Sequence, residues 1–176
     1  TAQHQLQIIN RLTWGANASA AREIAETGAA RFIEAQLRPA TAVRMPAEVE
    51  AQIAAMSISQ RPMTELVMEL EQRRRDVDAI ADPDQKKAAQ QSYQQEVNRL
   101  ANETATRFVL RALYSPDQLR EQMTWFWMNH FNLFQYKSDI RRLLADYEER
   151  AIRVHALGKF RDLVAATVHH PAMLRY

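Results

Sequence analysis

The chain contains only three glycines in 176 residues, Gly15, Gly28 and Gly158. Glycine takes a positive φ at no steric cost, so a chain with so few glycines has almost no positions for the tight turns of β-hairpins. Gly-rich phosphate-binding loops need several glycines at close spacing, and this sequence contains neither the P-loop nor the dinucleotide-binding fingerprint. The sequence therefore excludes those nucleotide-binding classes and disfavours a fold rich in hairpins.

Apolar residues recur at three- and four-residue spacing through almost the whole chain, which is the pattern of amphipathic α-helices. The first two such segments, over about 3–14 and 19–27, each end at a glycine, which is a common residue at helix C-termini. Further segments of this kind follow, and no stretch alternates apolar and polar residues for long enough to indicate a strand. We therefore predict an all-α fold.

Residues 62–114 predict a long helical hairpin whose two arms join at residues 82–84, Asp-Pro-Asp. Both arms are apolar near their base and strongly polar toward the turn, as expected if the base is buried and the tip stands in water. Three consecutive arginines, Arg73, Arg74 and Arg75, lie on the first arm. They form either a solvated helix face or a surface that binds a partner protein.

The most apolar segment is a predicted helix over about 117–134, with aromatic side chains on several of its sides. His130 shares a face of this helix with Trp127 and Phe134. A helix that is apolar around most of its circumference belongs in the interior of a fold. The predicted architecture is therefore a multi-helix bundle around this central aromatic helix, with the 62–114 hairpin attached.

A further helix is expected to begin at a cap on Ser138 or Asp139 and to run toward His155. It carries Glu148, seven residues before His155. In a regular α-helix this spacing places both side chains on one face, where the carboxylate could orient the imidazole.

Four blocks of the sequence occur in a recognisable order. They are LQIINRLTWG (6–15), LREQMTWFWMNHF (119–131), IRVHALGKFRDL (152–163) and HPAML (170–174). Together they resemble the signature blocks of the domain-of-unknown-function 1800 family. The resemblance implies a predominantly helical, exported bacterial protein of several hundred residues, and it supplies no established reaction.

The resemblance also implies that residues 1–176 are one helical domain that forms the N-terminal part of a longer one, because relatives continue past the Pro-Ala-Met-Leu motif. The expected partner is therefore the C-terminal remainder of the same protein, as a continuation or as a separate chain. A cell-envelope protein is a second expected partner.

The charges nearly cancel, with 23 Lys and Arg against 21 Asp and Glu, a net charge of +2. This excess is too small to indicate a nucleic-acid-binding surface. The absence of cysteine excludes disulfides and cysteine-based zinc sites, and no apolar run approaches the roughly 20 residues of a membrane span. The chain begins at Thr1, as an exported protein does after signal cleavage and as a trimmed chain also does. Together with the resemblance, this start predicts a periplasmic or secreted location.

His130, Glu148 and His155 form the candidate catalytic set. Imidazole titrates near neutral pH, and burial on an apolar helix would tune the pKa of His130 for acid–base catalysis. The alternative is a core histidine held by a hydrogen bond. No ligand spacing such as His-Glu-x-x-His occurs, so we predict no metal and no other cofactor.

Trp125, Trp127 and Tyr136 are the candidates for substrate binding. Aromatic faces stack on sugar rings, and a cleft that combines such faces with carboxylates is suited to glycoside cleavage. The alternative is that these aromatic side chains belong to the core.

Two functions remain open. The first is an exported hydrolase with His and carboxylate acid–base chemistry, which acts on an extracellular polymer such as a glycan and whose site is completed by chain beyond Tyr176. The second is a non-catalytic cell-envelope binding or assembly protein that uses the hairpin, with Arg73, Arg74 and Arg75, as its partner surface. The sequence leaves open whether the protein is an enzyme, and it leans toward the first function because a histidine on so apolar a helix is unusual for packing alone.

Overall fold

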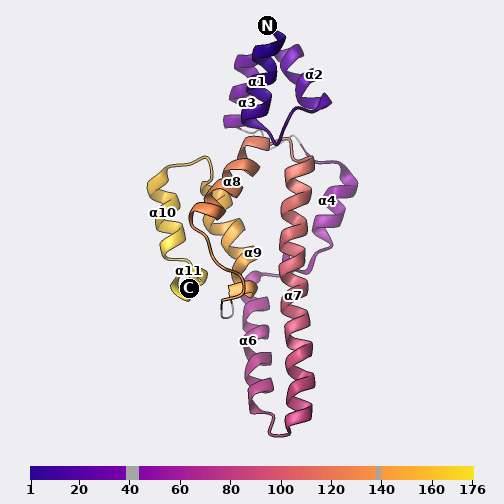
Figure 1. The fold of residues 1–176 in the computed structure, drawn as a ribbon, viewed down its shortest axis with the longest axis vertical. Helices are drawn as coiled ribbons and strands as arrows, with labels where there is room; N and C mark the ends of the chain where they lie inside the picture. The colour runs from indigo at the N-terminus through magenta and orange to yellow at the C-terminus, as the bar shows by residue number, and fades with distance from the viewer. Residues whose placement is uncertain (39–43, 138–139) are drawn as a thin grey trace.

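The computed structural model describes residues 1–38, 44–137 and 140–176, and within these ranges the elements are helices and no strand occurs (Figure 1). The α-helices are α1 (Ala2–Leu12), α2 (Ala18–Thr27), α3 (Ala29–Leu37), α4 (Ala47–Ala54), α5 (Ser57–Gln60), α6 (Met63–Ala79), α7 (Pro83–Tyr114), α8 (Gln118–His130), α9 (Leu144–Asp146), α10 (Phe160–Val168) and α11 (Pro171–Leu174). Three further helical turns are η1 (Ile140–Leu143), η2 (Tyr147–Ile152) and η3 (Arg153–His155). The predicted all-α class is confirmed. None of the described helices is both long and apolar enough to cross a membrane.

The helices α1 to α3 form a small unit at one end of the molecule, which we call the N-terminal cap (Figure 1). It has its own apolar cluster, in which Ile9, Ala20, Ile24 and Phe32 are buried. The chain passes directly from α2 into α3 at Gly28, whose φ of 84° lies in a region that residues with a side chain rarely adopt. The glycine predicted to end the second helix is thus required at this turn.

The helices α6 and α7 run antiparallel and form the predicted hairpin, whose tip lies at the end of the molecule opposite the cap (Figure 1). Pro83 occupies the first turn of α7, and the Asp82 side chain accepts a hydrogen bond from the backbone N–H of Gln85 at 2.8 Å. The 32 residues of α7 span about 48 Å, so this one helix reaches from the hairpin tip to the cap. The apolar residues at its inner face join α4, α5 and α6 in one core cluster, which includes Val49, Ile53, Leu70, Val77, Tyr93, Val97 and Leu100.

The aromatic helix, α8, is central by its contacts, because it packs against α1, α3, α7, η2 and η3. It ends at His130, earlier than the predicted residue 134, and residues 131–137 follow as an irregular loop. Its buried side chains are those of Glu121 and Thr124, whereas Trp125 and Phe126 are 49% and 51% exposed. Much of the aromatic surface of α8 therefore faces solvent.

The regular helix predicted to run to His155 is wrong. The segment is divided into the 3-10 turn η1, the single α-turn α9, the π-helix η2 and the 3-10 turn η3. In η2 the fully buried Tyr147 donates its hydroxyl hydrogen to the carbonyl oxygen of Phe131 at 2.9 Å. A π-helix is wider than an α-helix, so it changes the direction in which the following side chains project. The cap predicted at Ser138 or Asp139 lies outside the described residues.

The C-terminal helix α10 packs on η2, and α11 packs on η1 and α10, through a second core cluster to which Leu163 and Ala172 belong. The buried His170 links them to α9: its Nδ1 accepts from the backbone N–H of Ala172 at 3.1 Å, and its Nε2 lies 3.0 Å from Oδ2 of Asp146. Because Nδ1 is the acceptor, Nε2 carries the hydrogen and donates it to Asp146. This histidine therefore has a structural partner on each side.

Candidate functional site

A pocket of about 560 Å³ opens between α7, α8, the loop after α8 and the α9–η2 segment, and we call it the Glu148 pocket. Its wall is mainly apolar and includes Ala105, Phe108, Val109, Trp125, Met128, Leu133, Phe134, Tyr136 and Leu144. Of the described residues that line it, only Glu148 carries a carboxyl group, and none is basic. Its volume lies within the roughly 300–1,000 Å³ of small-molecule pockets, and a few polar groups in an apolar wall are typical of them.

Glu148 is the polar group of this pocket that is most altered by its surroundings. Its side chain is buried, with the residue only 2% exposed, and its Oε1 accepts no hydrogen bond from the described residues. Burial raises the pKa of Glu148 to about 7, because the charges of Arg107 and Arg111 offset only part of the cost of taking the carboxylate out of water. The carboxyl group therefore exists in both protonation states near neutral pH, as general acids and bases do.

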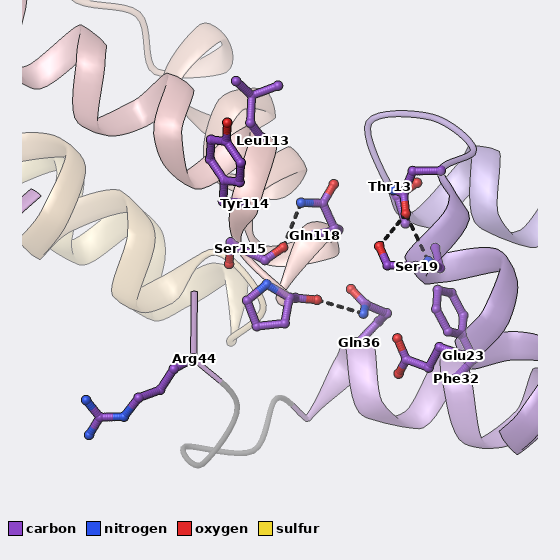
Figure 2. A pocket seen from close by; sticks show the side chains of 13 residues that line it. Thr13, Ser19, Glu23, Phe32, Gln36, Arg44, Leu113, Tyr114, Ser115 and Gln118 are labelled. Carbon is purple, nitrogen blue, oxygen red and sulfur yellow. Dashed lines mark hydrogen bonds between the residues drawn. The ribbon is translucent and has the colours of Figure 1, made fainter. Parts of the chain in front are cut away.

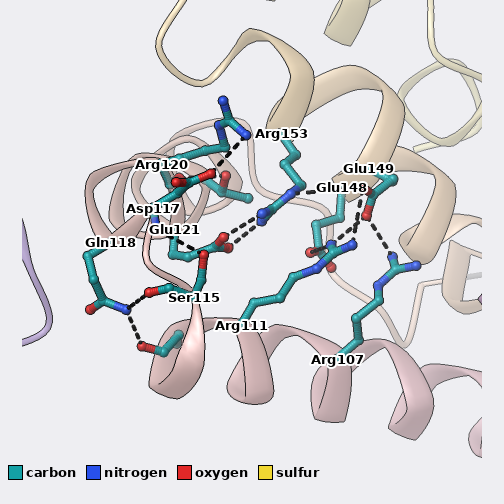
Figure 3. Close-up of polar contacts among 12 residues, drawn as sticks. Arg107, Arg111, Ser115, Asp117, Gln118, Arg120, Glu121, Glu148, Glu149 and Arg153 are labelled. Carbon is teal, nitrogen blue, oxygen red and sulfur yellow. Dashed lines mark hydrogen bonds and ion pairs between the residues drawn. The ribbon is translucent and has the colours of Figure 1, made fainter. Parts of the chain in front are cut away.

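Behind the pocket lies a group of alternating charges, which we call the arginine–glutamate cluster (Figure 3). It consists of Arg107 and Arg111 of α7, Glu121 of α8, Glu148 and Glu149 of η2, and Arg153 of η3. Both terminal nitrogens of Arg153 donate to the carboxylate of Glu121, which is fully buried. Pairing of this kind is what makes a buried charge tolerable, so Glu121 and Arg153 depend on each other.

Glu149 is the other carboxylate that the cluster holds firmly. Nη1 of Arg111 donates to its Oε2 at 2.6 Å, and Nη2 of Arg107 lies 3.4 Å from the same oxygen. Burial acts to raise the pKa of Glu149, but the hydrogen bond from Arg111 and the charges of Arg111 and Arg107 outweigh it, so this pKa lies below the ordinary value. By contrast, Arg111 approaches Glu148 only at 3.8 Å, from its Nη1 to Oε1.

The π-helix η2 carries these two glutamates, which are adjacent in the chain but have different surroundings. Glu148 lines the apolar pocket, while Glu149 is hydrogen-bonded by Arg111. Single π-turns are rare and are frequent at functional sites. The local irregularity of η2 and the perturbed carboxyl group of Glu148 therefore occur at the same place.

Three of the predicted site residues, Glu148, Trp125 and Tyr136, line the same pocket. They come from three different segments, η2, α8 and the loop after it, so tertiary packing brings them together. His130, His155 and Trp127 are not among the residues that line it.

His130 is exposed, and the expectation that it is buried in the core is wrong. Its ring packs among aromatic rings instead, with centroid distances of 4.8 Å to Phe131, 5.7 Å to Trp127 and 6.1 Å to Phe126. The helix α8, which carries His130, buries Glu121 and exposes Trp125 and Phe126. The burial that the sequence led us to expect for this imidazole is therefore absent.

The two remaining candidates for the site, His155 and Trp127, lie outside the Glu148 pocket. His155 lies in η3, after the π-helix, so the regular geometry that would align it with Glu148 is absent. Trp127 donates its Nε1 hydrogen to the carbonyl oxygen of Ala156 at 3.1 Å and stacks on Phe131, with ring centroids 6.0 Å apart. Trp127 therefore fastens α8 to the segment after η3.

The three arginines of the hairpin are engaged with neighbouring side chains. Arg73 donates to Oγ of Ser92 at 2.9 Å, across the hairpin. Arg74 forms ion pairs with Glu71 at 3.0 Å and with Asp78 at 3.2 Å, and Arg75 lies 3.6 Å from Glu71. Acidic residues of the same helix therefore compensate much of the positive charge of the triplet.

Arg107, Arg111, Phe108 and Arg153 belong to the candidate site but were not predicted from the sequence to be parts of it. One sequence signal was present, because Arg107 and Arg111 stand four residues apart and so lie on one face of a helix. A basic pair on the half-buried arm of a hairpin indicates a buried acidic partner. The identity of that partner depends on tertiary packing.

A second pocket, of about 340 Å³, lies between the N-terminal cap and the turn from α7 to α8 (Figure 2). Gln36 bridges its two sides, since its Nε2 donates to the carbonyl oxygen of Pro116 at 3.0 Å and its Oε1 accepts from the backbone N–H of Leu119 at 3.1 Å. Both polar atoms of this side chain are used in holding the cap, so the second pocket is a junction between structural units. Within the described residues, no three His, Asp or Glu side chains gather as a metal site would require.

The fold and the site together define a class: an all-α protein in which a π-helix presents a single perturbed carboxyl group to an apolar pocket. A family model described as a protein of unknown function, DUF1800, matches residues 7–176. The match covers nearly the whole chain, so the protein belongs to this family, and the resemblance seen in the four sequence blocks is confirmed. No curated protein and no solved structure matches the chain.

Proposed function

We propose that the protein is a hydrolase that holds the apolar part of an ester substrate in the Glu148 pocket and uses Glu148 as its general base and acid. The observation that carries this proposal is the position of Glu148, a buried carboxyl group of which one oxygen accepts no hydrogen bond from the described residues, in the wall of an apolar pocket. A pKa of about 7 makes both protonation states available at neutral pH. Trp125 and Tyr136 contribute aromatic faces to the same wall and position the substrate.

The reaction needs one carboxyl group. Ionised Glu148 takes a proton from a water molecule while the water oxygen forms a bond to the acyl carbon of the ester. The bond from that carbon to the alcohol oxygen then breaks, and Glu148 returns the proton to the alcohol. One water molecule is consumed, and an acid and an alcohol are released.

An ester suits this pocket better than the glycan considered from the sequence. Glycoside cleavage usually requires two carboxyl groups on opposite sides of the bond, about 5–9.5 Å apart. Glu148 is the only carboxyl-bearing residue among the described residues of the lining, and the neighbouring Glu149 is hydrogen-bonded by Arg111. A periplasmic or secreted location, and completion of the site by chain beyond Tyr176, stay predictions from the resemblance.

The test compares hydrolysis of p-nitrophenyl esters of short and medium chain length with that of p-nitrophenyl glycosides. We expect ester hydrolysis whose kcat/KM rises with pH through about 7, and a loss of at least about 100-fold in Glu148→Gln. Glu26→Gln removes an exposed carboxyl group on α2 and should leave the rate unchanged. Wild-type rates in Glu148→Gln would overturn the proposal, and turnover of glycosides alone would overturn the substrate class.

A pair of α7 variants tests the place of the reaction. Ala105 lines the pocket and is exposed enough to accept a larger side chain, so Ala105→Trp should fill the pocket and abolish hydrolysis. Thr106 is the next residue. It is exposed and does not line the pocket, so Thr106→Trp should retain the hydrolytic activity. Equal activity in the two variants would place the reaction elsewhere.

The alternative function, a cell-envelope binding protein that uses the hairpin, stays a prediction. Its partner surface would rest on Arg73, Arg74 and Arg75, whose charges are largely compensated by Glu71 and Asp78. The pocket is therefore the feature that better supports a function.

A further inference from the structure

The charges that act on Glu148 are those of Arg107 and Arg111 from α7, Glu149 on η2 itself and Arg153 from η3. Glu121 from α8 completes the cluster through its ion pair with Arg153. With all six groups of the cluster ionised, three positive charges balance three negative ones. When Glu148 takes a proton, the cluster carries one uncompensated positive charge.

The hydrogen bonds of the cluster indicate that Glu148 is the group that changes its protonation state. Glu121 is held by both terminal nitrogens of Arg153, and Glu149 is held by both terminal nitrogens of Arg111. Among the residues that the structure describes, Oε1 of Glu148 accepts no hydrogen bond, and the buried Nε of Arg107 donates none. The acid that faces the pocket is thus the one that the arginines hold least firmly.

These observations decide which ligand charge the pocket favours. A cationic head group beside Glu148 would also lie close to Arg111, whose Nη1 is 3.8 Å from Oε1 of Glu148, and the two like charges would repel each other in a largely apolar environment. An anionic head group would instead compensate the positive charge that remains when Glu148 is protonated. The protonated carboxyl can also donate a hydrogen bond to that anion.

From this geometry we infer that the Glu148 pocket binds amphiphilic carboxylates, with the apolar chain against the aromatic wall and the carboxylate accepting a hydrogen bond from protonated Glu148. The balance is simple: one proton from solvent joins an oxygen of Glu148, one carboxylate enters, and no other covalent bond forms or breaks. The inference rests on the pocket of the proposed function and names its ligand class. In ester hydrolysis this ligand is the acid product.

The experiment is calorimetric titration of the wild-type chain with octanoate, in buffers of low and high ionisation enthalpy. Octylamine and 1-octanol are the matched probes, because they carry a cationic and a neutral head group on the same chain. We expect octanoate to bind most tightly, with its Kd independent of pH between about 6 and 6.5 and rising about tenfold per pH unit above about 7. Proton uptake should approach one per octanoate at about pH 8.5, which the difference in heat between the two buffers measures.

Two variants sharpen the result. Glutamine resembles protonated glutamic acid in shape and charge, so Glu148→Gln should bind octanoate within about threefold of the wild-type affinity near pH 6. Binding to this variant should take up no proton, and its affinity for octanoate should not fall above pH 7. Ala105→Trp should abolish binding, whereas Thr106→Trp should not. The measurement of proton uptake needs only the wild-type chain, so it decides the question even if a variant fails to fold.

Any of three results would overturn the inference. They are tighter binding of octylamine than of octanoate, octanoate binding without proton uptake at high pH, and octanoate binding that survives in Ala105→Trp. The two proposals can fail separately. If ester turnover depends on Glu148 but octanoate does not bind, the proposed hydrolase is supported and carboxylates are rejected as the ligand class. Octanoate binding with the expected proton uptake, but without ester turnover, would leave a carboxylate-binding protein and remove the hydrolase.

Discussion

Burial acts on both Glu148 and Glu149, yet their pKa values move in opposite directions. For Glu148 the loss of hydration dominates and raises the pKa to about 7, while for Glu149 the hydrogen bond from Arg111 outweighs that loss and lowers it. The difference arises from the partner and not from the residue type. A protein that needs a proton carrier and a permanent anion in one place can therefore build both from glutamate.

At the residue scale, we predict that Glu148→Gln stabilises the protein near pH 8 and changes its stability little near pH 5. The pKa of Glu148 is raised from 4.5 to about 7 in the folded protein, so between these values the folded state holds a proton that the unfolded state releases. The stability of the wild type therefore falls as pH rises through this window, by at most about 3 kcal/mol. Glutamine does not ionise and avoids this loss, which urea unfolding at the two pH values measures.

Glu149→Gln is the informative comparison, because it removes a carboxylate whose pKa is lowered in the folded state. It should destabilise the protein at neutral pH, since Arg111 then loses its closest partner. If Glu148→Gln gave the same change in unfolding free energy at both pH values, ionisation of Glu148 would not be the cost that we assign to it.

At the scale of elements, a buried arginine of η1 is one of the residues that tie the hairpin to the rest of the fold. Nη1 of Arg142 lies 2.6 Å from Oε2 of Glu71 on α6, and Arg142 itself is buried. The hydrogen bonds from Arg142 and Arg74 lower the pKa of Glu71 to about 2. Glu71 thus joins two elements that are distant in sequence and also holds part of the arginine triplet.

We predict that Glu71→Gln destabilises the protein at neutral pH and that the difference from wild type disappears near pH 2. Because the pKa of Glu71 is lowered from 4.5 in the folded state, its stabilising contribution is complete above 4.5 and is lost as pH falls toward 2. Thermal unfolding over this pH range measures the effect. Glu69→Gln, on the same helix, breaks only an exposed pair with Arg61 and should change stability by less than about 1 kcal/mol. A constant difference between Glu71→Gln and wild type down to pH 2 would contradict the assignment.

At the scale of the whole molecule, glutamine side chains attach the N-terminal cap to the start of α8. Gln36 spans Pro116 and Leu119, and Gln122 of α8 donates to the carbonyl oxygen of Thr13 at the end of α1. These bonds connect a separate apolar cluster to the body that carries the Glu148 pocket. The cap therefore positions the first turn of α8, on which the fully buried Glu121 lies.

We predict that Gln36→Met weakens the docking of the cap by about 1–3 kcal/mol, because the partly buried backbone groups of Pro116 and Leu119 lose their partner. Hydrogen exchange should increase along α1 to α3 and at the start of α8, while the hairpin stays protected. Gln7→Met changes an exposed glutamine of α1 and should alter none of these rates. Faster exchange spread evenly over the whole chain would show that the cap is not a separate unit.

Local sequence signals were sufficient for most of the fold. Apolar spacing, the Asp82-Pro83 helix start and the glycine between α2 and α3 predicted the helices and the hairpin. The π-helix was not predictable in the same way, because the residues of η2 continue an ordinary helical pattern. Its wider turn is compatible with the packing of Tyr147 and Ile152, which are fully buried among distant segments.

The sequence by itself determined the class of fold, the hairpin and the family, because helical periodicity, capping residues and motif order are local properties. Only the tertiary structure decided that His130 faces solvent, that Glu148 faces an apolar pocket, and that Arg107, Arg111 and Arg153 stand behind it. The physical reason is that burial and charge pairing depend on which side chains meet across α7, α8 and η2. A pKa follows from those neighbours, and residue type alone does not supply it.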